Sequence, residues 1–169
     1  MEVFEAARTM LAVRRYQAKP VPEAVLRRVL EAGRLTGSSI NLQPWAFVTV
    51  EDREMLKKLA ALARSGPYIA QAGAAIVVAV ERNSRYGVSD GSRAIQSMLL
   101  TAWNEGVGGN WVGFAGMEGV RELMGIPKEM DVLAVLSLGY PAQAAGKGKK
   151  NRKALSEIAH KERWGQTWS

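Results

Sequence analysis

The sequence predicts an α+β fold in which helices flank a mixed β-sheet, and three observations carry this prediction. First, 169 residues with 47% hydrophobic and 23% charged side chains suit one globular domain. Second, helical and strand-like patterns alternate along the chain, but two helices precede the first strand, which favours α+β over a doubly wound α/β arrangement. Third, the continuous apolar run 74–80 indicates a central strand buried on both faces.

The N-terminal third of the chain predicts two helices joined by an extended segment. Residues 2–12 carry apolar side chains at helical spacing, and residues 13–19 are extended and basic. Pro22 suits the first turn of a second helix, because proline has no N–H to leave unpaired there. That helix should end near Gly37, and an irregular loop over 40–44 should follow.

The middle of the chain predicts a strand, a helix and the central strand. Residues 45–50 form the first strand, and Glu51-Asp52 caps a third helix with apolar residues at helical spacing. A turn at 65–67 separates this helix from the strand at 74–80.

The longest predicted helix begins at Ser89 or Asp90, either of which is a good N-cap, and runs to about Glu105. Its nearly all-round apolar character indicates a buried helix. The remaining elements are a strand at 110–114, a helix at 119–124, a strand at 132–138 and, after a Gly/Lys-rich linker at 146–150, a short helix at 154–160.

The composition excludes several kinds of chemistry. The absence of cysteine removes disulfides, thiolate nucleophiles and Cys-based metal sites, and a single histidine, His160, removes multi-His centres. A bound cofactor, or no chemistry at all, is what remains. The N-terminus does not resemble a secretory signal and no apolar run could span a bilayer, so we expect a cytoplasmic protein with no membrane partner.

The net charge of +7 is concentrated in one segment. Residues 147–163 carry seven basic side chains against two acidic ones, so a basic tail follows a nearly neutral domain. Such a tail fits an anionic partner, which includes nucleic acid, a membrane surface or a phosphorylated small molecule. The basic residues lack interleaved aromatic side chains before Trp164, which makes nucleic acid the weaker choice.

Four short segments are candidates for binding. Asn41 and Gln43, in the loop before the first strand, offer amides that both donate and accept hydrogen bonds, although on composition alone turn chemistry is the better explanation of these residues. Arg14 and Arg15 follow the first helix and suit a phosphate, or simply a solvated surface.

The other two candidates are a glycine block and a cationic pair. Residues 106–113 are rich in glycine, which allows close backbone approach to a ligand but also suits a helix end followed by a tight turn. Lys150 and Arg152 lie two residues apart, so that an extended backbone points both side chains to one side. We expect His160 at the surface or capping a helix, Asp90 as a cap and Trp103 in the core.

Taken in order, these segments resemble the nitroreductase family of FMN-dependent flavoproteins from about residue 3 to residue 165. The blocks that carry the resemblance are R-R-Y-x-x-K-P-V-P (14–22), S-S-I-N-L-Q-P-W (38–45), G-V-G-G-N-W-V-G-F (106–114), L-G-Y-P-A (138–142), K-N-R (150–152) and E-R-W-G (162–165). The N-L-Q-P-W block after the two serines is the most specific of them.

The resemblance implies an intertwined α+β homodimer with FMN at the subunit interface, in which 141–169 is a basic extension serving the phosphate site and the dimer. NADH or NADPH would reduce the flavin, and a small oxidised acceptor such as a nitroaromatic or a quinone would then reoxidise it in a ping-pong reaction. The flavin carries the chemistry, so no catalytic side chain and no metal is implied.

By position, the resemblance assigns ten cofactor-binding residues. Arg14, Lys150 and Arg152 would meet the FMN phosphate. Ser38, Ser39 and Asn41 match a loop that often reaches the partner subunit's flavin, and Gln43 belongs to the same motif. Trp111, Val112 and Gly113 match a segment whose backbone lies beside the flavin ring.

The sequence departs from the family pattern at one place. Where the family usually has Arg, then Arg or His, then Ser before the Val-Arg pair, this chain has Met10-Leu11-Ala12. Arg15 and Lys149 are candidates to compensate, whereas Arg8 is out of register. The departure motivates an alternative, a non-catalytic flavin- or nucleotide-binding protein on the same scaffold, and a basic nucleic-acid-binding domain is a weaker third hypothesis.

Overall fold

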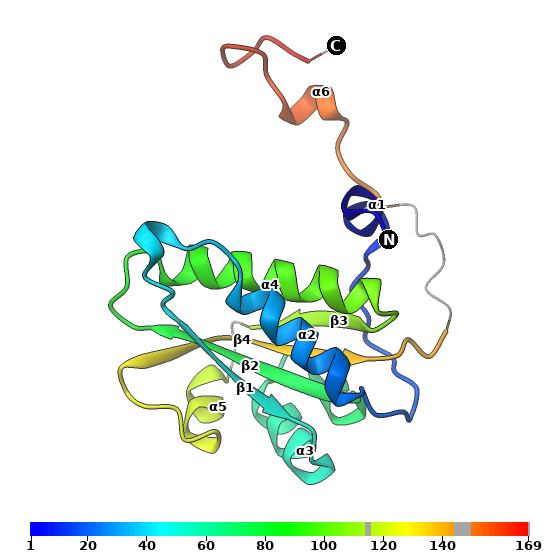
Figure 1. Ribbon diagram of the computed structural model, residues 1–169, viewed down its shortest axis with the longest axis vertical. Helices are drawn as coiled ribbons and strands as arrows, with labels where there is room; N and C mark the ends of the chain where they lie inside the picture. The colour runs from blue at the N-terminus through cyan, green and yellow to red at the C-terminus, as the bar shows by residue number, and fades with distance from the viewer. Residues whose placement is uncertain (114–115, 144–149, 169) are drawn as a thin grey trace.

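The computed structural model describes residues 1–113, 116–143 and 150–168, and it has one four-stranded sheet with the order β1-β2-β4-β3 (Figure 1). The strands are β1 (Trp45–Val50), β2 (Ala74–Glu81), β3 (Gly108–Val112) and β4 (Met130–Gly139). The helices are α1 (Val3–Thr9), α2 (Glu23–Arg34), α3 (Arg53–Leu62), α4 (Gly87–Asn104), α5 (Met117–Leu123) and α6 (Leu155–Ile158), with short 3-10 turns η1 (Ser39–Asn41) and η2 (Pro67–Gln71).

The four strands pair antiparallel throughout, and the parallel component of the expected mixed sheet is a single bridge between Ala12 and Gly109. This bridge lies on the free side of β3, and Val13 N–H donates to Gly109 O across 3.0 Å there. The extended segment after α1 therefore covers the first part of an edge strand. The predicted α+β class is confirmed.

The central strand β2 divides the core into two halves, as its continuous apolar sequence predicts. Ala75 and Val77 face one cluster of buried side chains, whereas Ala74, Ile76 and Val78 face the other. This alternation is the period of two that any strand imposes on its side chains. Both faces of the sheet are thus closed to water.

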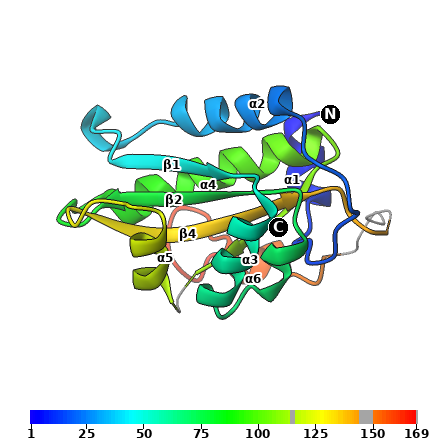
Figure 2. The same ribbon diagram turned by 90° about the horizontal axis from the view of Figure 1, so that it is seen from below.

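Helices cover both faces of the sheet (Figure 2). Helices α2 and α4 pack together over one face, where Val29, Ile95 and Met98 are buried. Helices α3 and α5 cover the other face, where Leu56, Leu59 and Val120 are buried. Asp52 caps α3 as predicted, because its carboxylate accepts from Met55 N–H at 2.8 Å.

Several predicted boundaries were wrong. Helix α1 ends at Thr9 rather than residue 12, because the chain must extend at Ala12 to reach Gly109. Helix α2 ends at Arg34, three residues before Gly37. Helix α5 and strand β4 begin two residues earlier than predicted, and α6 has only one turn. Strand β3 begins two residues earlier, at Gly108, and Phe114, in its predicted end, lies outside the described residues.

The predicted start of the longest helix was also wrong. Helix α4 begins at Gly87, with Tyr86 at its N-cap, so Ser89 and Asp90 both lie inside the helix. Asp90 is fully buried there and its N–H is already used by Tyr86 O at 2.8 Å. Its carboxylate therefore serves another purpose than capping α4.

The C-terminal arm, residues 150–168, runs away from the body of the molecule (Figure 1). Lys150 Nζ donates to Ala7 O at the base of the arm, at 2.5 Å. From Lys153 onwards, the described residues of the arm hydrogen-bond only with one another. Most of the predicted linker, 146–150, lies outside the described residues, as do Lys147 and Lys149. In the described part of the chain, no helix has the length and apolar character needed to cross a membrane.

A buried hydroxyl pair ties the segment after α1 to β4 and generates the first prediction. Tyr16 Oη lies 2.6 Å from Val13 O and 2.7 Å from Ser137 Oγ. Replacing Tyr16→Phe leaves both partners buried without this bond, so the free energy of unfolding should fall by about 1–3 kcal/mol in urea. Tyr140→Phe is the control, because the Tyr140 hydroxyl makes no hydrogen bond within the described residues, and its change should stay within about 0.5 kcal/mol.

The same variant has a pH signature. Burial raises the pKa of the Tyr16 phenol above its usual value of 10.0. An unfolded chain therefore loses this proton first, so the stabilisation is complete below about pH 10 and is lost as the pH rises further. Wild-type protein should lose stability above pH 10 more steeply than Tyr16→Phe, and equal slopes would contradict the assignment.

Candidate functional site

The ten predicted site residues fall in three places on the fold. Ser38, Ser39, Asn41 and Gln43 lie in the loop between α2 and β1, which we call the amide loop (residues 38–43). Arg14, Lys150 and Arg152 lie near α1 and the base of the arm. Trp111, Val112 and Gly113 lie on and just beyond β3.

The amide loop is tied together by its own polar groups. Gln43 N–H donates to Ser38 Oγ at 2.9 Å, and Gln43 Nε2 donates to Asn41 O and Oδ1, both at 3.3 Å. Gln43 therefore shapes the loop from inside, as a motif residue that holds the backbone would. The side chain of Ile40 between them is 82% exposed, so burial of apolar surface contributes little to this conformation.

The backbone of the amide loop is strained. Ile40, Asn41 and Gln43 all adopt the left-handed region, with φ of 46°, 58° and 52°. Asparagine tolerates this region, whereas a β-branched isoleucine does so at a cost of about 1–2 kcal/mol. Strain of this kind is kept only where surrounding contacts impose it, and it concentrates at binding sites.

A carboxylate from α4 binds the amide loop at Ser39, next to the strained residues. Ser39 N–H donates to Asp90 Oδ2 at 2.9 Å, and Ser39 Oγ donates to Asp90 Oδ1 at 3.1 Å. Arg93, one turn further along α4, pairs with the same carboxylate and neutralises it. The amide loop is thus fixed to the N-terminal part of α4.

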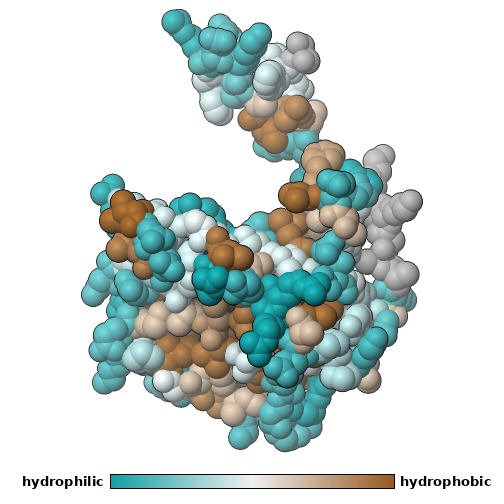
Figure 3. Space-filling view, viewed as in Figure 1, coloured by the Kyte–Doolittle hydropathy of each residue, from teal (hydrophilic) through white to brown (hydrophobic). Residues whose placement is uncertain are grey.

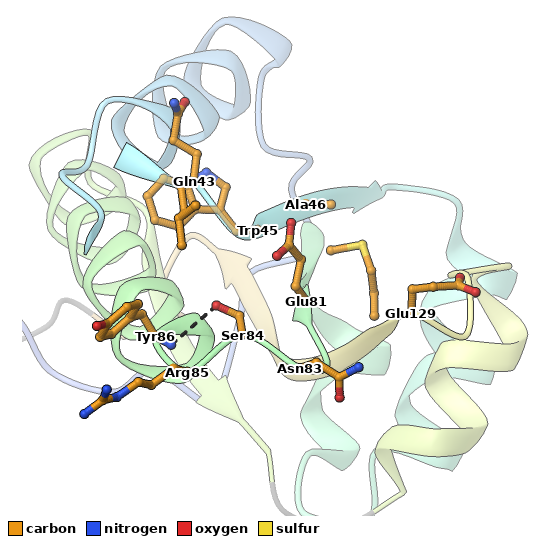
Figure 4. A pocket seen from close by; sticks show the side chains of 11 residues that line it. Gln43, Trp45, Ala46, Glu81, Asn83, Ser84, Arg85, Tyr86 and Glu129 are labelled. Carbon is orange, nitrogen blue, oxygen red and sulfur yellow. Dashed lines mark hydrogen bonds between the residues drawn. The ribbon is translucent and has the colours of Figure 1, made fainter. Parts of the chain in front are cut away.

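An open pocket of about 760 Å³ lies beside the amide loop (Figure 4). Gln43 and Trp45 approach it from the loop and from β1, and Arg85 and Tyr86 approach from the connection between β2 and α4. Glu129 lies on its far side. Aromatic and charged residues therefore line a pocket next to the loop that the sequence singled out.

The two adjacent arginines line a second, smaller pocket. Arg14 and Arg15 share a hollow of about 250 Å³ with Leu11–Val13 on one side and Pro141–Gln143 on the other. The Arg14 guanidinium also lies over the ring of Tyr68, 6.0 Å from its centroid. Arginine side chains at a hollow suit an anion, and Arg15, as one of the lining residues, can add charge that Met10-Leu11-Ala12 does not supply.

The remaining cationic residues are placed less directly. Lys150 Nζ is bound to the last turn of α1 through Ala7 O, and Arg152 is exposed, with its guanidinium on the carbonyl of Asn151. Arg8 is paired with Glu5 on the same helix at 2.6 Å. Lys149, the other candidate for compensation, lies outside the described residues.

The third group presents backbone rather than side chains. Gly109 O accepts from Val13 on the side of β3 that faces away from β4. Because backbone groups alternate along a strand, those of Trp111 face the same free side. Gly113 O also turns outward, to Ser65 Oγ at 3.0 Å. Val112 instead packs its side chain into the core, so this side chain is not open to a ligand.

The glycines before this segment act in packing. Gly106 ends α4 with a φ of 75° and open space around it, which is the behaviour of a helix C-terminal glycine. A Cβ on Gly108 would lie 2.3 Å from a methyl group of Val13, so this glycine lets the extended segment reach β3. Of the two interpretations of the glycine block, the structure favours the turn and close packing of the chain on itself.

The structure does not bring the three groups together within one chain. Asp90 holds the amide loop near the N-terminus of α4, whereas Arg14 lies beside Gly109, beyond the C-terminus of the same helix. The 18 residues of α4 span about 27 Å. Arg14 and the β3 segment are neighbours, but the amide loop is at the opposite end of the molecule (Figure 1).

The predictions for three further residues had different outcomes. Trp103 is half-buried against Tyr16 and Val13, as expected, and its indole N–H donates to Thr9 Oγ1 at 3.0 Å. His160 is half-buried in the arm, where its ring lies tilted against Trp164 with 4.3 Å between the centroids; neither ring nitrogen has a hydrogen-bond partner within the described residues, so it does not cap a helix. Asp90 was missed as a site residue, although it falls on the buried stripe of α4, four and eight residues before Ala94 and Met98.

The chain is similar to known proteins over most of its length. The model of the nitroreductase family matches residues 8–82 and 63–140. The chain belongs to the nitroreductase family. Among its relatives, a "Putative NADH dehydrogenase/NAD(P)H nitroreductase" of Archaeoglobus fulgidus is 34% identical over 172 residues, which covers 96% of this chain and 99% of that one.

Another relative and a solved structure are consistent with membership of this family. An "FMN reductase [NAD(P)H]" of Bacillus subtilis is 27% identical over 185 residues, covering 95% of this chain and 74% of that one. The crystal structure of a "Putative NADH dehydrogenase/NAD(P)H nitroreductase" from Bacteroides thetaiotaomicron superposes with a TM-score of 0.88 at 29% identity and covers 96% of this chain and 98% of that one.

The strained amide loop generates the second prediction. Ile40→Gly removes a β-branched residue from the left-handed region and sacrifices almost no buried surface. The free energy of unfolding should rise by about 0.5–1 kcal/mol, since the relieved strain exceeds the added entropy of glycine in the unfolded chain. Chemical unfolding followed by circular dichroism measures the change.

Val88→Gly is the matched control for that variant. Val88 is also β-branched and exposed, but it lies in the regular helix α4. Glycine there should lower the free energy of unfolding by about 0.5 kcal/mol. A loss of stability in both variants would show that residue 40 is not strained.

Proposed function

We propose that this nitroreductase-family protein is an FMN-dependent oxidoreductase that passes reducing equivalents from NADH or NADPH to a small oxidised acceptor, such as a nitroaromatic or a quinone, in a ping-pong reaction. The observation that carries the proposal is the pairing of two arginines at one hollow with the free backbone edge of β3 beside it. An anionic group and a flat ring system are what this pair of features suits.

The donor set fits FMN at both of its ends. Arg14 and Arg15 can meet a phosphate dianion with charge-assisted hydrogen bonds, and the base of the arm adds Lys150 nearby at α1. The outward backbone of Trp111 can lie along the edge of a ring, whereas Gly113 O already accepts from Ser65 Oγ. The amide groups of Asn41 and Gln43 match a heterocycle whose edge mixes donors and acceptors.

FMN and the protein would have different roles in this reaction. When bound, FMN would supply the hydride and electron chemistry, which the chain cannot draw from a cysteine and for which the described residues hold no metal cluster. The protein's own groups bind the phosphate, and backbone N–H groups on the β3 edge stabilise negative charge that develops at the ring. The names of its relatives, which include an "FMN reductase [NAD(P)H]", support a reduced nicotinamide as the electron source.

We also propose that the working form is a homodimer of single-domain subunits, residues 1–169, in which 141–169 serves the phosphate site and the partner. The amide loop and Arg14 lie at opposite ends of α4, so a second copy is needed to bring the two groups to one flavin. The arm presents Leu155 and Ile158 at 67% and 62% exposure. Apolar surface over α6 and α1 is visible in Figure 3, and surface of this kind marks interaction sites.

One observation supports a second candidate function, that of a non-catalytic flavin-binding protein. Met10-Leu11-Ala12 leaves the turn after α1 without polar side chains, and Ala12 is used to pair with Gly109. A protein that binds flavin but does not pass on electrons would tolerate a weaker phosphate site. Anaerobic addition of NADH and NADPH separates the two, because only the enzyme bleaches the flavin absorbance.

The phosphate assignment generates the third prediction. Arg14→Ala should weaken FMN binding by roughly 10- to 150-fold, the loss of one charge-assisted hydrogen bond worth about 1.5–3 kcal/mol. Riboflavin, which has no phosphate, should bind wild type and Arg14→Ala equally. Flavin fluorescence quenching measures both dissociation constants.

Arg27→Ala is the control for the loss of a positive charge. Arg27 is exposed on α2 and pairs only with Glu23, at 3.2 Å, within the described residues. Arg27→Ala should change the FMN dissociation constant less than twofold. An Arg14 variant that loses riboflavin as strongly as FMN would contradict a phosphate contact, and wild-type protein that takes up no FMN would refute the proposed function.

The dimer generates the fourth prediction. In size-exclusion chromatography with light scattering, the protein should have twice its 18.4 kDa chain mass. The double variant Leu155→Ser, Ile158→Ser should have a higher dimer dissociation constant than wild type, because exposed apolar side chains of the arm are lost from the interface. Leu35→Ser, which changes an equally exposed leucine after α2, should not alter the mass. A monomeric wild type would overturn the dimer.

A further inference from the structure

Asp90 is the one charged residue that is fully buried in the described part of the chain. A buried carboxylate is costly unless hydrogen bonds and an opposite charge compensate it. Arg93 supplies the charge, and its own side chain remains 53% exposed. Ser39 supplies both a backbone N–H and a hydroxyl. All the partners of the Asp90 carboxylate are therefore one arginine and one residue of the amide loop.

The amide loop depends on this contact. Within the described residues, the other hydrogen bonds of residues 38–43 join the loop to itself, apart from a long contact of 3.4 Å from Arg93 to Ser39 Oγ and a bond from Trp45 N–H, at the start of β1, to Gln43 O at 2.8 Å. The side chains of Ile40 and Leu42 are 82% and 50% exposed, so packing does not hold the loop either. With three non-glycine residues at positive φ, the free loop would relax to other conformations.

We propose that Asp90 is a positioning residue for the flavin site: it holds the amide loop in the strained conformation that presents Asn41 and the neighbouring amides to FMN. The proposal rests on the proposed function, because it names FMN as the ligand of the loop. Asp90 acts through Ser39 and need not touch the flavin. Asp90 orders the loop before the ligand arrives. This lowers the entropic cost of ordering the loop when FMN binds.

The carboxylate is needed in its charged form of two acceptor oxygens. Oδ2 accepts from Ser39 N–H, while Oδ1 accepts from Ser39 Oγ and from Arg93. An asparagine of the same shape has one acceptor oxygen and one NH₂ group. In either orientation its NH₂ group faces a donor, so Asp90→Asn loses part of the anchor and Asp90→Ala loses all of it.

The test measures the loop and the ligand separately. Hydrogen exchange of the flavin-free protein, read on a peptide that covers 36–46, reports the anchor. Fluorescence titration reports the FMN dissociation constant. We expect Asp90→Asn to speed exchange in this peptide and to raise the FMN dissociation constant about tenfold or more, and Asp90→Ala to exceed it in both. The visible spectrum of bound FMN should also change, because the amides around the ring are no longer fixed.

Asp131→Asn is the matched control. Asp131 also pairs with an arginine, Arg82, at 2.6 Å, but it lies on β4, separated from β1 by β2, and within the described residues it makes no hydrogen bond to the amide loop. The same substitution there should change neither the exchange of 36–46 nor the FMN affinity. Circular dichroism of Asp90→Asn should match wild type, and this variant keeps the test valid if Asp90→Ala does not fold.

The outcomes separate the two proposals. Wild-type FMN affinity together with wild-type exchange in Asp90→Asn would overturn the role of Asp90 and leave the proposed function intact. Faster exchange with unchanged FMN affinity would also overturn the role of Asp90 at the flavin site. Asp90 would then hold the amide loop, but FMN binding would not depend on it. Absence of FMN binding by wild-type protein would instead refute the proposed function, and the role of Asp90 with it.

Discussion

The length of α4 is the constraint on which the candidate site depends. This helix of 18 residues runs about 27 Å across one face of the sheet. Asp90 near its start holds the amide loop. The turn after its end leads into β3, where Val13 donates a hydrogen bond to Gly109 and so places Arg14 beside this strand. Because α4 is packed over β2 and β3 and against α2, it keeps these two polar regions apart. Two copies in opposite orientation would turn this separation into two complete sites.

The sheet determines what the second region can offer. Strand β3 is at the edge of the order β1-β2-β4-β3, so one side of its backbone has no partner strand in the described residues. The segment after α1 covers that side only near Gly109, where glycine allows Val13 to approach. Beyond it, Trp111 and Gly113 turn backbone groups outward, and Ala12 and Val13, which adjoin Gly109, line the hollow of Arg14 and Arg15. A ring edge and a phosphate can thus be met by one short stretch of structure.

Local patterns in the sequence predicted most of the fold. The apolar run 74–80, the strand 45–50 and the Asp52 cap all appear where expected, since each depends on neighbours in sequence. Asp90 was mistaken for a helix cap because its true partner, Ser39, is 51 residues away and no local pattern records such a contact. The motifs likewise identified the amide loop and Arg14 but not their distance from each other, which arises from the packing of α4. Positive φ at Ile40 is equally invisible in a sequence, because isoleucine is the residue least suited to it.

Complementation between two defective chains tests the shared site most directly. Arg14→Ala and Asn41→Ala would be coexpressed with different affinity tags, and the mixed dimer would be purified through both. If each site takes Arg14 from one chain and the amide loop from the other, the mixed dimer has one site with both defects and one that is intact. The account predicts one FMN bound per mixed dimer with wild-type affinity, although both homodimers bind weakly. Two equally weak sites in the mixed dimer would contradict it, because each site would then be built within a single chain.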